Sequence, residues 1–310
     1  AGHYNKWNWD LMQSHKIKRD LAEQLIAVGL NPLDVSEVVL RALHEDCDGD
    51  GDVTSVATIS AEQMSTLDFV ARAPGVIAGM PVAAAVFAIL GGSSIRMSSV
   101  IRDGESVQAG TVLGSIVGST RVLLQGERPA LNLLSHLSAI ATATRAWADA
   151  LSDSTTKVRD TRKTTPGMRI LEKYAVRCGG GLNHRMNLSD AALIKDNHVV
   201  AAGGVARAYE LIKQRYPNLP VEVEVDSMDQ LAEALEVGAD LVLLDNFTIE
   251  ELKSAVDLTG GRAKLEASGG FTFDQAKEVA NTGVDFVAVG AITHSAPVLD
   301  IGADLRMESI

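Results

Sequence analysis

A regular alternation of strands and helices in the second half of the chain most limits how it can fold. Four apolar strand patterns recur there, VEVEVD, LVLLDN, KLEASGG and FVAVGA, and helical patterns lie between them near residues 228–238, 248–258 and 274–282. Matching positions are each 21 residues apart, at Glu224, Asp245, Glu266 and Val287. Nearly continuous apolar strands separated by helices indicate a parallel sheet, and the unbroken period favours a barrel over an open doubly wound sheet. The segments KVRDT and AALIKDN add two earlier strands, so we expect about six strands and an open, incomplete α/β barrel.

The first half of the chain predicts a separate domain. Residues 14–29 and 31–45 are typical of two packed helices, the second beginning at Pro32 and carrying Leu33, Val38, Val39 and Ala42 at helical spacing. Residues 64–124 contain short β-rich runs cut by PG, DG and AG turns, with one helical run, PVAAAVFAILG. The prediction is an α/β protein with a loose arm at 1–13, an α+β sandwich domain at 14–128, the open barrel at 129–295 and a tail at 296–310 that can return to the first domain.

A long amphipathic helix is predicted for residues 126–151, with apolar residues at three- and four-residue steps. Pro129 would lie in its first turn, where no amide hydrogen is needed. Arg128 beside it is unfavourable near the positive end of a helix dipole. It is therefore either a surface arginine or a side chain that reaches an anion.

The distribution of charge points to a small anionic ligand. The whole chain carries a formal net charge of −12, but residues 157–195 hold nine Lys or Arg against three acids. An acidic protein that concentrates its cations in one segment is best explained by a pocket for a small, multiply charged anion. A nucleic-acid surface is disfavoured, because the rest of the chain would repel a phosphate backbone.

Several other classes are excluded or disfavoured. Two cysteines, Cys47 and Cys178, cannot form a disulfide framework and fit a reducing compartment. No run approaches the roughly 20 apolar residues of a membrane helix and no signal-like apolar core opens the chain, so we expect a cytoplasmic protein without a membrane partner. The turns of VIRDGESVQAGTVLGSIVG resemble lipoyl carriers, but no Lys occurs between Lys18 and Lys157. DCDGDGDVTS imitates a calcium loop, yet Ala57 stands where the closing Glu belongs, so a solvated turn is the better interpretation.

Polar residues follow the predicted strands at their carboxyl ends. These are Arg162, Lys163, Lys195, Glu224, Asp226, Asp245, Ser268, Gly269, Gly270 and Gly290. In a barrel such positions surround one mouth, where active sites of this architecture form. The late glycine segments SGG and VGA are suited to a phosphate, since backbone amides there are not covered by side chains.

The acids and the histidine of this mouth leave alternatives open. Glu224 and Asp245 could hold Mg²⁺, accept hydrogen bonds from ribose hydroxyls, or form salt bridges with nearby lysines. His184 beside Arg185 is better suited to bind an anion than to act as a general base, because cationic neighbours disfavour its protonated form and no nucleophile is evident. Cys178 has no paired base and is interpreted as packing.

These segments, in this order and spacing, resemble the quinolinate phosphoribosyltransferase family. The residues that carry the resemblance are DTRKT from Asp160, KYAVRCGGGLNHR from Lys173, LSDAALIKDNH from Leu188, EVEVD from Glu222, LLDNF from Leu243, SGG from Ser268 and VGAITHS from Val289. The resemblance covers the chain from about residue 30. It implies an N-terminal sandwich and an open α/β barrel in a homodimer or a trimer of dimers, and Mg²⁺-dependent conversion of quinolinate and phosphoribosyl pyrophosphate to nicotinate mononucleotide, pyrophosphate and CO₂.

The same resemblance implies roles for individual residues. Thr161 lies in the DTRKT motif, and Arg162, His184 and Arg185 would bind the quinolinate carboxylates, with Arg128 reaching in from the neighbouring subunit. Lys163 and Lys195 would face the pyrophosphate and the reacting centre, and Glu224 and Asp245 the ribose and Mg²⁺. The 5′-phosphate would meet the backbone of Ser268, Gly269, Gly270, Val289, Gly290 and Ala291, with His294 nearby. Pro129 departs from the Thr that is usual in the family after this Arg.

The sequence leaves two alternatives open. One is a paralogue that uses another aromatic acid, such as the molybdenum-transport-associated relative of the family. The other is an anion-binding protein without catalytic activity, which would bind ligand without turnover.

Overall fold

The computed structural model describes residues 17–47 and 51–307, which divide into two units. The first unit takes the described residues up to Thr142, with Ile170–Cys178 and the residues from Pro297 onward. The second consists of Ala143–Arg169 and Gly179–Ala296. The predicted arm at residues 1–13 and two acids of the calcium-like loop, Asp48 and Asp50, lie outside the described residues.

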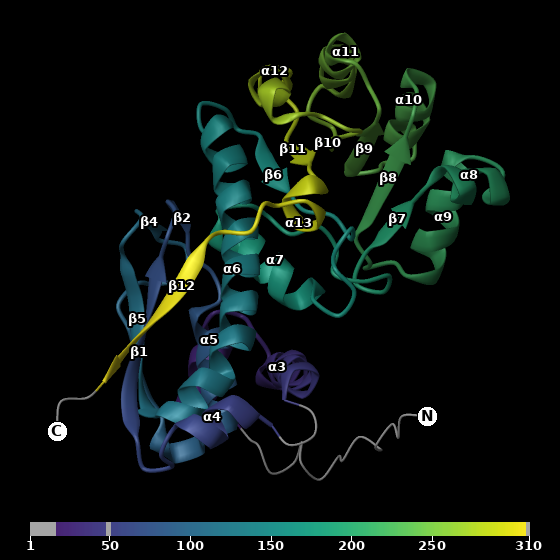
Figure 1. Ribbon diagram of the computed structural model, residues 1–310. Helices are drawn as coiled ribbons and strands as arrows, with labels where there is room; N and C mark the ends of the chain where they lie inside the picture. The colour runs from purple at the N-terminus through teal and green to yellow at the C-terminus, as the bar shows by residue number, and fades with distance from the viewer. Residues whose placement is uncertain (1–16, 48–50, 308–310) are drawn as a thin grey trace, which may run out of the picture. The chain divides into compact units, whose positions relative to one another are not determined.

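A four-stranded antiparallel sheet forms the centre of the first unit, in the order β12-β1-β5-β3 (Figure 1). Its strands are β1 (Met64–Ala71), β3 (Arg96–Ser99), β5 (Val112–Ser119) and β12 (Ile301–Met307), and a separate antiparallel pair is formed by β2 (Gly75–Val76) and β4 (Ser106–Val107). Strand β12, drawn in yellow in Figure 1, runs beside β1 with Ile301 opposite Ala71 and Met307 opposite Ser65. The C-terminal tail therefore completes the sheet of the first unit.

The helices of the first unit cover this sheet and include one that returns from later in the chain. They are α2 (Arg19–Ala27), α3 (Pro32–Asp46), α4 (Val53–Thr58), α5 (Met80–Gly91), the 3₁₀ turn η1 (Gly92–Ser94), most of α6 (Thr120–Ala150) and nearly all of α7 (Arg169–Cys178). The apolar face predicted for α3 is rotated, because Val35, Val39 and Leu43 are buried whereas Leu33 is 73% exposed. Leu33 lies in the first turn, where its amide donates to the Asn31 cap.

Aromatic and aliphatic side chains join the sheet to α5. Phe69 of β1 and Phe87 of α5 are fully buried with ring centroids 6.2 Å apart. Gly126 lets α6 approach closely, since a Cβ there would lie 2.7 Å from the Phe87 ring. Burial of each such side chain contributes about 1.5–3 kcal/mol to folding, so this contact is a main part of the first core.

Helix α6 begins at Thr120 and not at residue 126 as predicted. Residues 120–124 look like a β-rich run in the sequence, but they follow β5 directly and continue as helix. Pro129 therefore lies inside the helix, where it has no N–H for the Gln125 carbonyl, and the prediction that it occupies the first turn is wrong. Arg128 is also away from the helix start, so the helix-dipole argument for it does not apply. The predicted boundary between residues 128 and 129 falls within this one helix.

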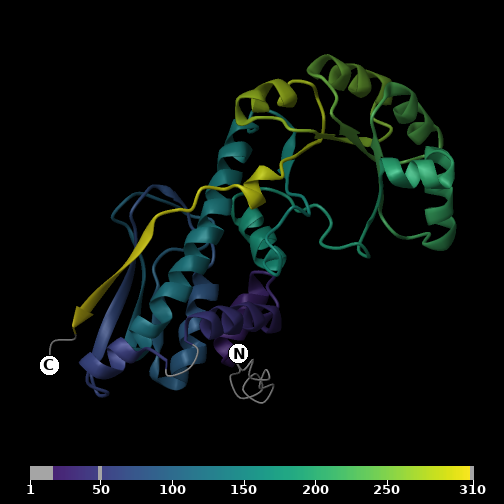
Figure 2. The same ribbon diagram turned by 45° about the vertical axis from the view of Figure 1, so that its right-hand side comes forward.

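A six-stranded parallel sheet forms the second unit, in the order β6-β11-β10-β9-β8-β7. Its strands are β6 (Lys157–Arg159), β7 (Ala192–Ile194), β8 (Val221–Val225), β9 (Leu241–Asp245), β10 (Lys264–Ser268) and β11 (Phe286–Ala288). A single parallel bridge from Arg159 to Leu182 extends the sheet beyond β6. Within the described residues no pairing joins β6 to β7, so the sheet curves without closing, as predicted (Figure 2).

Helices connect successive strands of the second unit and lie outside the curved sheet (Figure 2). They are α8 (Asp196–Ala202), α9 (Val205–Arg215), α10 (Met228–Glu236), α11 (Ile249–Thr259), η2 (Phe273–Gln275) and α12 (Ala276–Ala280), and the short helix α13 (Ala291–His294) follows the last strand, β11. The end of α6 packs on this unit through Trp147, whose ring meets Phe273 edge-on at 5.6 Å. Among the described residues, no helix combines the length and the apolar character that crossing a membrane requires.

Candidate active site

Strand register brings the predicted polar residues of β8, β9 and β10 to one face and one end of the sheet. Glu224 lies opposite Leu243, and Asp245 lies opposite Ser268. Because side chains alternate along a strand, Glu224, Asp245 and Ser268 point to the same side. Asp245 and Ser268 are the last residues of their strands, and Glu224 is the last but one. The structure thus gathers these groups at the carboxyl edge.

Lys195 and Glu224 form the closest ion pair at this edge. Lys195 follows the last residue of β7, and its Nζ lies 2.6 Å from Glu224 Oε2. The Lys195 side chain is 46% exposed, so it can exchange Glu224 for a ligand at little cost. Asp245 Oδ2 accepts a hydrogen bond from the side-chain Nδ2 of Asn246 at 2.8 Å. The salt-bridge alternative considered for the two acids therefore applies to Glu224 in this structure.

The loop after β10 has a conformation that only glycine adopts easily. Gly269 has φ = 116° and Gly270 has φ = 67°. A Cβ on Gly269 would lie 2.5–2.8 Å from three atoms of Asn246, and the Asn246 amide donates to the Ser268 carbonyl at 2.9 Å. The two loops that follow β9 and β10 are thus packed backbone to backbone.

A second glycine, Gly290, allows Lys163 and His294 to approach the loop after β11. A Cβ on Gly290 would lie 3.1 Å from Lys163 Cδ and 3.2 Å from His294 Nε2. Thr293 donates to the Lys163 carbonyl at 2.8 Å, which ties the loop after β6 to the short helix α13. The Lys163 amide in turn donates to Thr161 Oγ1 at 3.0 Å. The DTRKT and VGAITHS motifs are therefore neighbours in the structure, with Val289 and Ala291 on either side of Gly290.

Two arginines carry unsatisfied donors into the same region. The Nε atoms of Arg162 and Arg185 are buried and have no hydrogen-bond partner. Burial, and next the positive charge of Arg162, lower the pKa of Arg185. The guanidinium groups are therefore close enough to repel each other. Such an arrangement is stabilised when an anion with two acceptor groups lies between them.

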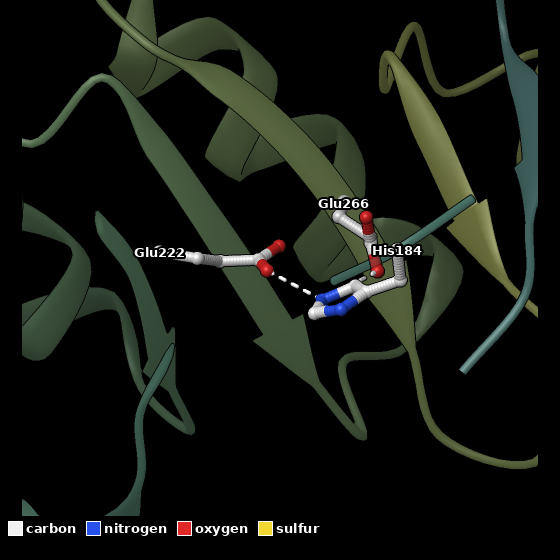
Figure 3. Close-up of side chains that lie close together, drawn as sticks. All are labelled: His184, Glu222 and Glu266. Atoms are coloured by element: carbon white, nitrogen blue, oxygen red, sulfur yellow. Dashed lines mark ion pairs between the residues drawn. The ribbon is translucent and has the colours of Figure 1, made fainter. Parts of the chain in front are cut away.

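His184 lies in a buried cluster with Glu222 and Glu266 (Figure 3). Its Nε2 is 2.6 Å from Glu222 Oε2 and 3.9 Å from Glu266 Oε1. Its Nδ1 accepts a hydrogen bond from the Arg185 amide at 2.8 Å. Both ring nitrogens are thus engaged within the protein. The predicted direct contact between His184 and a ligand anion would require this arrangement to change.

Arg159 balances the charge of the two glutamates. It forms an ion pair with Glu266, and its Nη1 lies 3.7 Å from Glu222 Oε1. Burial, and next the negative charge of Glu222, raise the pKa of Glu266 to about 8. Glu266 therefore keeps its proton to a higher pH than an exposed glutamate does, and Arg159 balances its charge when it is ionised.

The sequence interpretation missed four buried members of this region, which are Arg159, Asp160, Glu222 and Glu266. Asp160 is fully buried and accepts hydrogen bonds from the His184 amide at 2.8 Å and from the Asn183 side chain at 2.6 Å. Two signals were available. Glu222 alternates with Glu224 in VEVEV, which places both on one face, and Glu266 is itself a matching point of the 21-residue repeat.

Arg128 belongs to the first unit. It is exposed on α6, and it lines a cavity of about 440 Å³ with Leu131, Asn132, Ser135 and residues 298–301. Within residues 17–47 and 51–307, Arg128 forms no salt bridge. Its charge is available to a ligand or to another chain.

Comparison with known sequences identifies both parts of the chain. Residues 52–138 match the profile of the N-terminal domain of quinolinate phosphoribosyl transferase, and residues 140–304 match that of its C-terminal domain. A nicotinate-nucleotide pyrophosphorylase [carboxylating] from Mycobacterium leprae is 47% identical over 273 residues, which cover 87% of this chain and 96% of the relative. A probable enzyme of the same name from Bacillus subtilis is 38% identical, covering 90% and 96%.

Solved structures agree with these sequence matches. NadC from Streptococcus pyogenes superposes with a TM-score of 0.87 at 38% identity, covering 90% of this chain and 99% of that one. The nicotinate-nucleotide pyrophosphorylase from Francisella tularensis superposes with a TM-score of 0.84 at 36% identity, covering 94% and 98%. The fold and the order of motifs therefore extend over nearly the whole length of these relatives.

Proposed function

This chain belongs to the quinolinate phosphoribosyltransferase family, and from that premise we propose how its residues divide the work of the reaction. The chain is a decarboxylating phosphoribosyltransferase of NAD biosynthesis. It joins quinolinate to phosphoribosyl pyrophosphate and yields nicotinate mononucleotide, pyrophosphate and CO₂. Neither a different acceptor nor a non-catalytic role is favoured by the relatives named above.

Quinolinate is bound by Arg162 and Arg185. The observation that carries this assignment is the pair of buried Nε donors without partners on two arginines whose charges repel. The two adjacent carboxylates of quinolinate would satisfy both donors and neutralise both charges. Arginine suits this task because its planar fork of N–H groups matches a carboxylate.

Phosphoribosyl pyrophosphate occupies the carboxyl edge of the sheet. The 5′-phosphate meets the backbone amides of the loops at Ser268–Gly270 and Val289–Ala291, where glycines remove side chains that would block it. Lys163 lies beside Gly290 and Lys195 beside Glu224, so both ammonium groups can turn toward the pyrophosphate. Their positive charge stabilises the leaving group, an effect of several kcal/mol in a closed site.

The residues at this edge are suited to hold Mg²⁺. Glu224 and Asp245 supply carboxylate oxygens from adjacent parallel strands, and Mg²⁺ prefers one or two carboxylates together with water and substrate phosphates. When bound, the ion would neutralise charge on the departing pyrophosphate. Lys195 must then release Glu224, which its exposed position allows. The same two acids can accept hydrogen bonds from the ribose hydroxyls.

Catalysis follows from position and charge. Loss of pyrophosphate leaves an oxocarbenium-like ribose, which nearby carboxylates such as Glu224 favour. The quinolinate nitrogen then bonds to the ribose carbon and becomes a ring cation. That cation stabilises the electron pair left on the adjacent ring carbon when its carboxylate leaves as CO₂, and this carbon then takes up a proton from water. The protein has only to hold the carboxylates in place, so the chemistry needs no organic cofactor.

The working assembly is a homodimer in the cytoplasm. Arg128 carries an exposed positive charge that no residue of the described chain neutralises, and its position beside a cavity suits insertion into a second chain. A C2 dimer would then hold two sites, each with Arg128 from the partner.

The reaction is tested by measuring release of pyrophosphate and CO₂ from phosphoribosyl pyrophosphate with quinolinate or nicotinate, with and without Mg²⁺. Turnover with quinolinate, no turnover with nicotinate and loss of activity in EDTA are expected. Turnover that persists after complete removal of divalent ions would exclude the metal role. Absence of turnover with quinolinate would contradict the assigned reaction.

The arginine assignment is tested separately. Arg162→Met and Arg185→Met should each raise the KM for quinolinate by about 10- to 100-fold, because a charge-assisted bidentate contact is worth roughly 1.5–3 kcal/mol. The KM for phosphoribosyl pyrophosphate should change little. Arg207→Met, which removes a charge that is 60% exposed, is the matched control and should leave both constants unchanged.

The shared site is tested by subunit exchange. Arg128→Ala and Lys195→Ala should each be inactive alone. In an equal mixture, half of the dimers are mixed and each has one intact site, so about one quarter of the wild-type activity should return. If exchange is shown by mass spectrometry and no activity returns, Arg128 does not act across an interface.

A further inference from the structure

We propose that Glu222 and His184 are positioning residues that hold Arg185 in place for a quinolinate carboxylate. His184 does this as a neutral ring that accepts a hydrogen bond from the Arg185 backbone, and it is not a charged ligand of quinolinate. The proposal rests on the assignment of Arg185 to quinolinate given above. It adds Glu222, Glu266 and Arg159 to the residues that the reaction needs. It also changes the role that sequence motifs suggest for His184.

The hydrogen bonds of His184 define which nitrogen carries the proton. Nδ1 accepts from the backbone amide of Arg185, so Nδ1 cannot itself bear a hydrogen. The ring proton is then on Nε2, which donates to Glu222 Oε2 at 2.6 Å. A doubly protonated ring would place two N–H groups against each other at Nδ1. The arrangement therefore selects the neutral ring and leaves no N–H for a ligand.

The side chains that hold this ring come from two strands, and a third strand supports them. Glu222 extends from β8 and Glu266 from β10 (Figure 3), and Arg159 of β6 contacts both carboxylates. All three side chains are at most 13% exposed, so water does not compete for these contacts. Asp160, next to Arg159, accepts from the His184 amide. The ring and its backbone are thus held on both sides by buried groups.

These contacts fix the position of Arg185. Its amide is held by His184 Nδ1 at 2.8 Å, and its Nη1 donates to the Ala191 carbonyl at 3.1 Å. Nε remains without a partner. The backbone and one end of the guanidinium are therefore fixed before the ligand arrives. Fixing a ligand-binding group in advance lowers the entropy cost of binding, and small displacements of such a group are costly to catalysis.

The alternative to a positioning role is that the cluster of His184, Glu222 and Glu266 binds a metal ion. His184, Glu222 and Glu266 each offer one atom, and these atoms lie within 4.8 Å of one another. The guanidinium of Arg159 already contacts both carboxylates, however, and would repel a second cation. The contacts favour the positioning role.

The first test observes the His184 ring directly in the full-length protein, with ¹⁵N-labelled histidine and His184→Gln for assignment of the signal. We expect Nε2 protonated and Nδ1 unprotonated in the free protein, and the same pattern after quinolinate is added. A doubly protonated His184 ring in the quinolinate complex would overturn the proposal, because the histidine would then be a cationic ligand. Line broadening and loss of the signal on addition of Zn²⁺ would also overturn it, in favour of a metal site.

The second test separates positioning from structure by kinetics. Glu222→Leu removes the acceptor for Nε2 and should raise the KM for quinolinate by about 10- to 100-fold, with a smaller effect on the KM for phosphoribosyl pyrophosphate. Glu222→Gln keeps an acceptor oxygen and should restore most of the affinity for quinolinate. Glu210→Leu, the same change at a side chain that is 64% exposed, is the matched control.

The outcomes distinguish this proposal from the assigned reaction. If wild-type protein shows no quinolinate-dependent turnover, the assigned reaction fails. The protonation of the His184 ring in the free protein still tests whether His184 is the neutral ring that holds the Arg185 backbone. If wild-type protein turns over and Glu222→Leu has an unchanged KM for quinolinate, the positioning role is refuted. An equal loss for both substrates, without rescue by Glu222→Gln, would likewise refute it, since the loss would then be structural.

Discussion

The substitution Gly269→Ala tests whether the loop after β10 is the phosphate cradle. Gly269 has φ = 116°, and a Cβ there would lie 2.5 Å from Asn246 Oδ1, 2.7 Å from its amide nitrogen and 2.8 Å from its Cα. Two of these atoms are backbone, so a rotamer change cannot relieve the contact. The bond from the Asn246 amide to the Ser268 carbonyl must lengthen or break.

The size of the effect can be estimated from these contacts. A positive φ costs alanine about 1–2 kcal/mol, and an extra methyl in a packed site costs about 1–3 kcal/mol more. Asn246 follows Asp245, so the displacement also moves a predicted ligand of ribose and Mg²⁺. We expect the KM for phosphoribosyl pyrophosphate to rise and kcat/KM to fall by about 100-fold, since a displacement near 1 Å can cost that much.

The control is Gly261→Ala, in the turn before β10. Gly261 has φ = 77°, and a Cβ there would meet nothing within 4 Å, so this variant carries the backbone cost without the clash. Steady-state kinetics and urea unfolding of both variants separate activity from stability. If Gly269→Ala retains wild-type KM and kcat, or if Gly261→Ala loses as much activity, the loop after β10 does not hold the phosphate.

Three further predictions concern stability and reactivity. The pKa of Glu266 is raised from 4.5 to about 8, so in that range the folded chain holds a proton that the unfolded chain has lost. The free energy of unfolding should therefore fall as pH rises from about 5 to 8, by at most about 1.4 kcal/mol per pH unit for this group. Urea unfolding of Glu266→Gln should show a flatter dependence, and an identical slope would contradict the assignment. Phe69→Ala should lower the free energy of unfolding by about 3–5 kcal/mol, whereas Leu33→Ala, at an exposed position, should change it by less than about 0.5 kcal/mol. Burial raises the pKa of the Cys178 thiol to about 11, so iodoacetamide should modify Cys178 far more slowly in the folded protein than in urea; equal rates by mass spectrometry would show that the site is open.

The parallel sheet and its active edge could be predicted from the sequence because they depend on local order. Apolar strands at a constant spacing require helices between them, and a residue that follows such a strand must lie at the carboxyl edge. Lys195, Asp245 and Ser268 were placed correctly for this reason. Alternation in VEVEV likewise determines that Glu222 and Glu224 share a face.

Tertiary structure decided the features that depend on which distant residues meet. The helix at residues 120–150 extends over a segment whose composition resembles a strand, because packing of Leu123 and Gly126 outweighs local preference. The predicted return of the C-terminal tail to the first domain is confirmed, but only the structure decides that it pairs with β1, with residues more than 200 positions away.

The buried cluster around His184 is the clearest case of this kind. Alternation assigns a face to Glu222 and to Glu266, but strand order and register decide that Arg159 lies between them and that His184 donates to one of them. Burial then raises the pKa of Glu266, and the Arg185 amide selects the neutral histidine. The sequence determined which chemical groups stand at the edge of the sheet, and their contacts across neighbouring strands decided which of them bear charge.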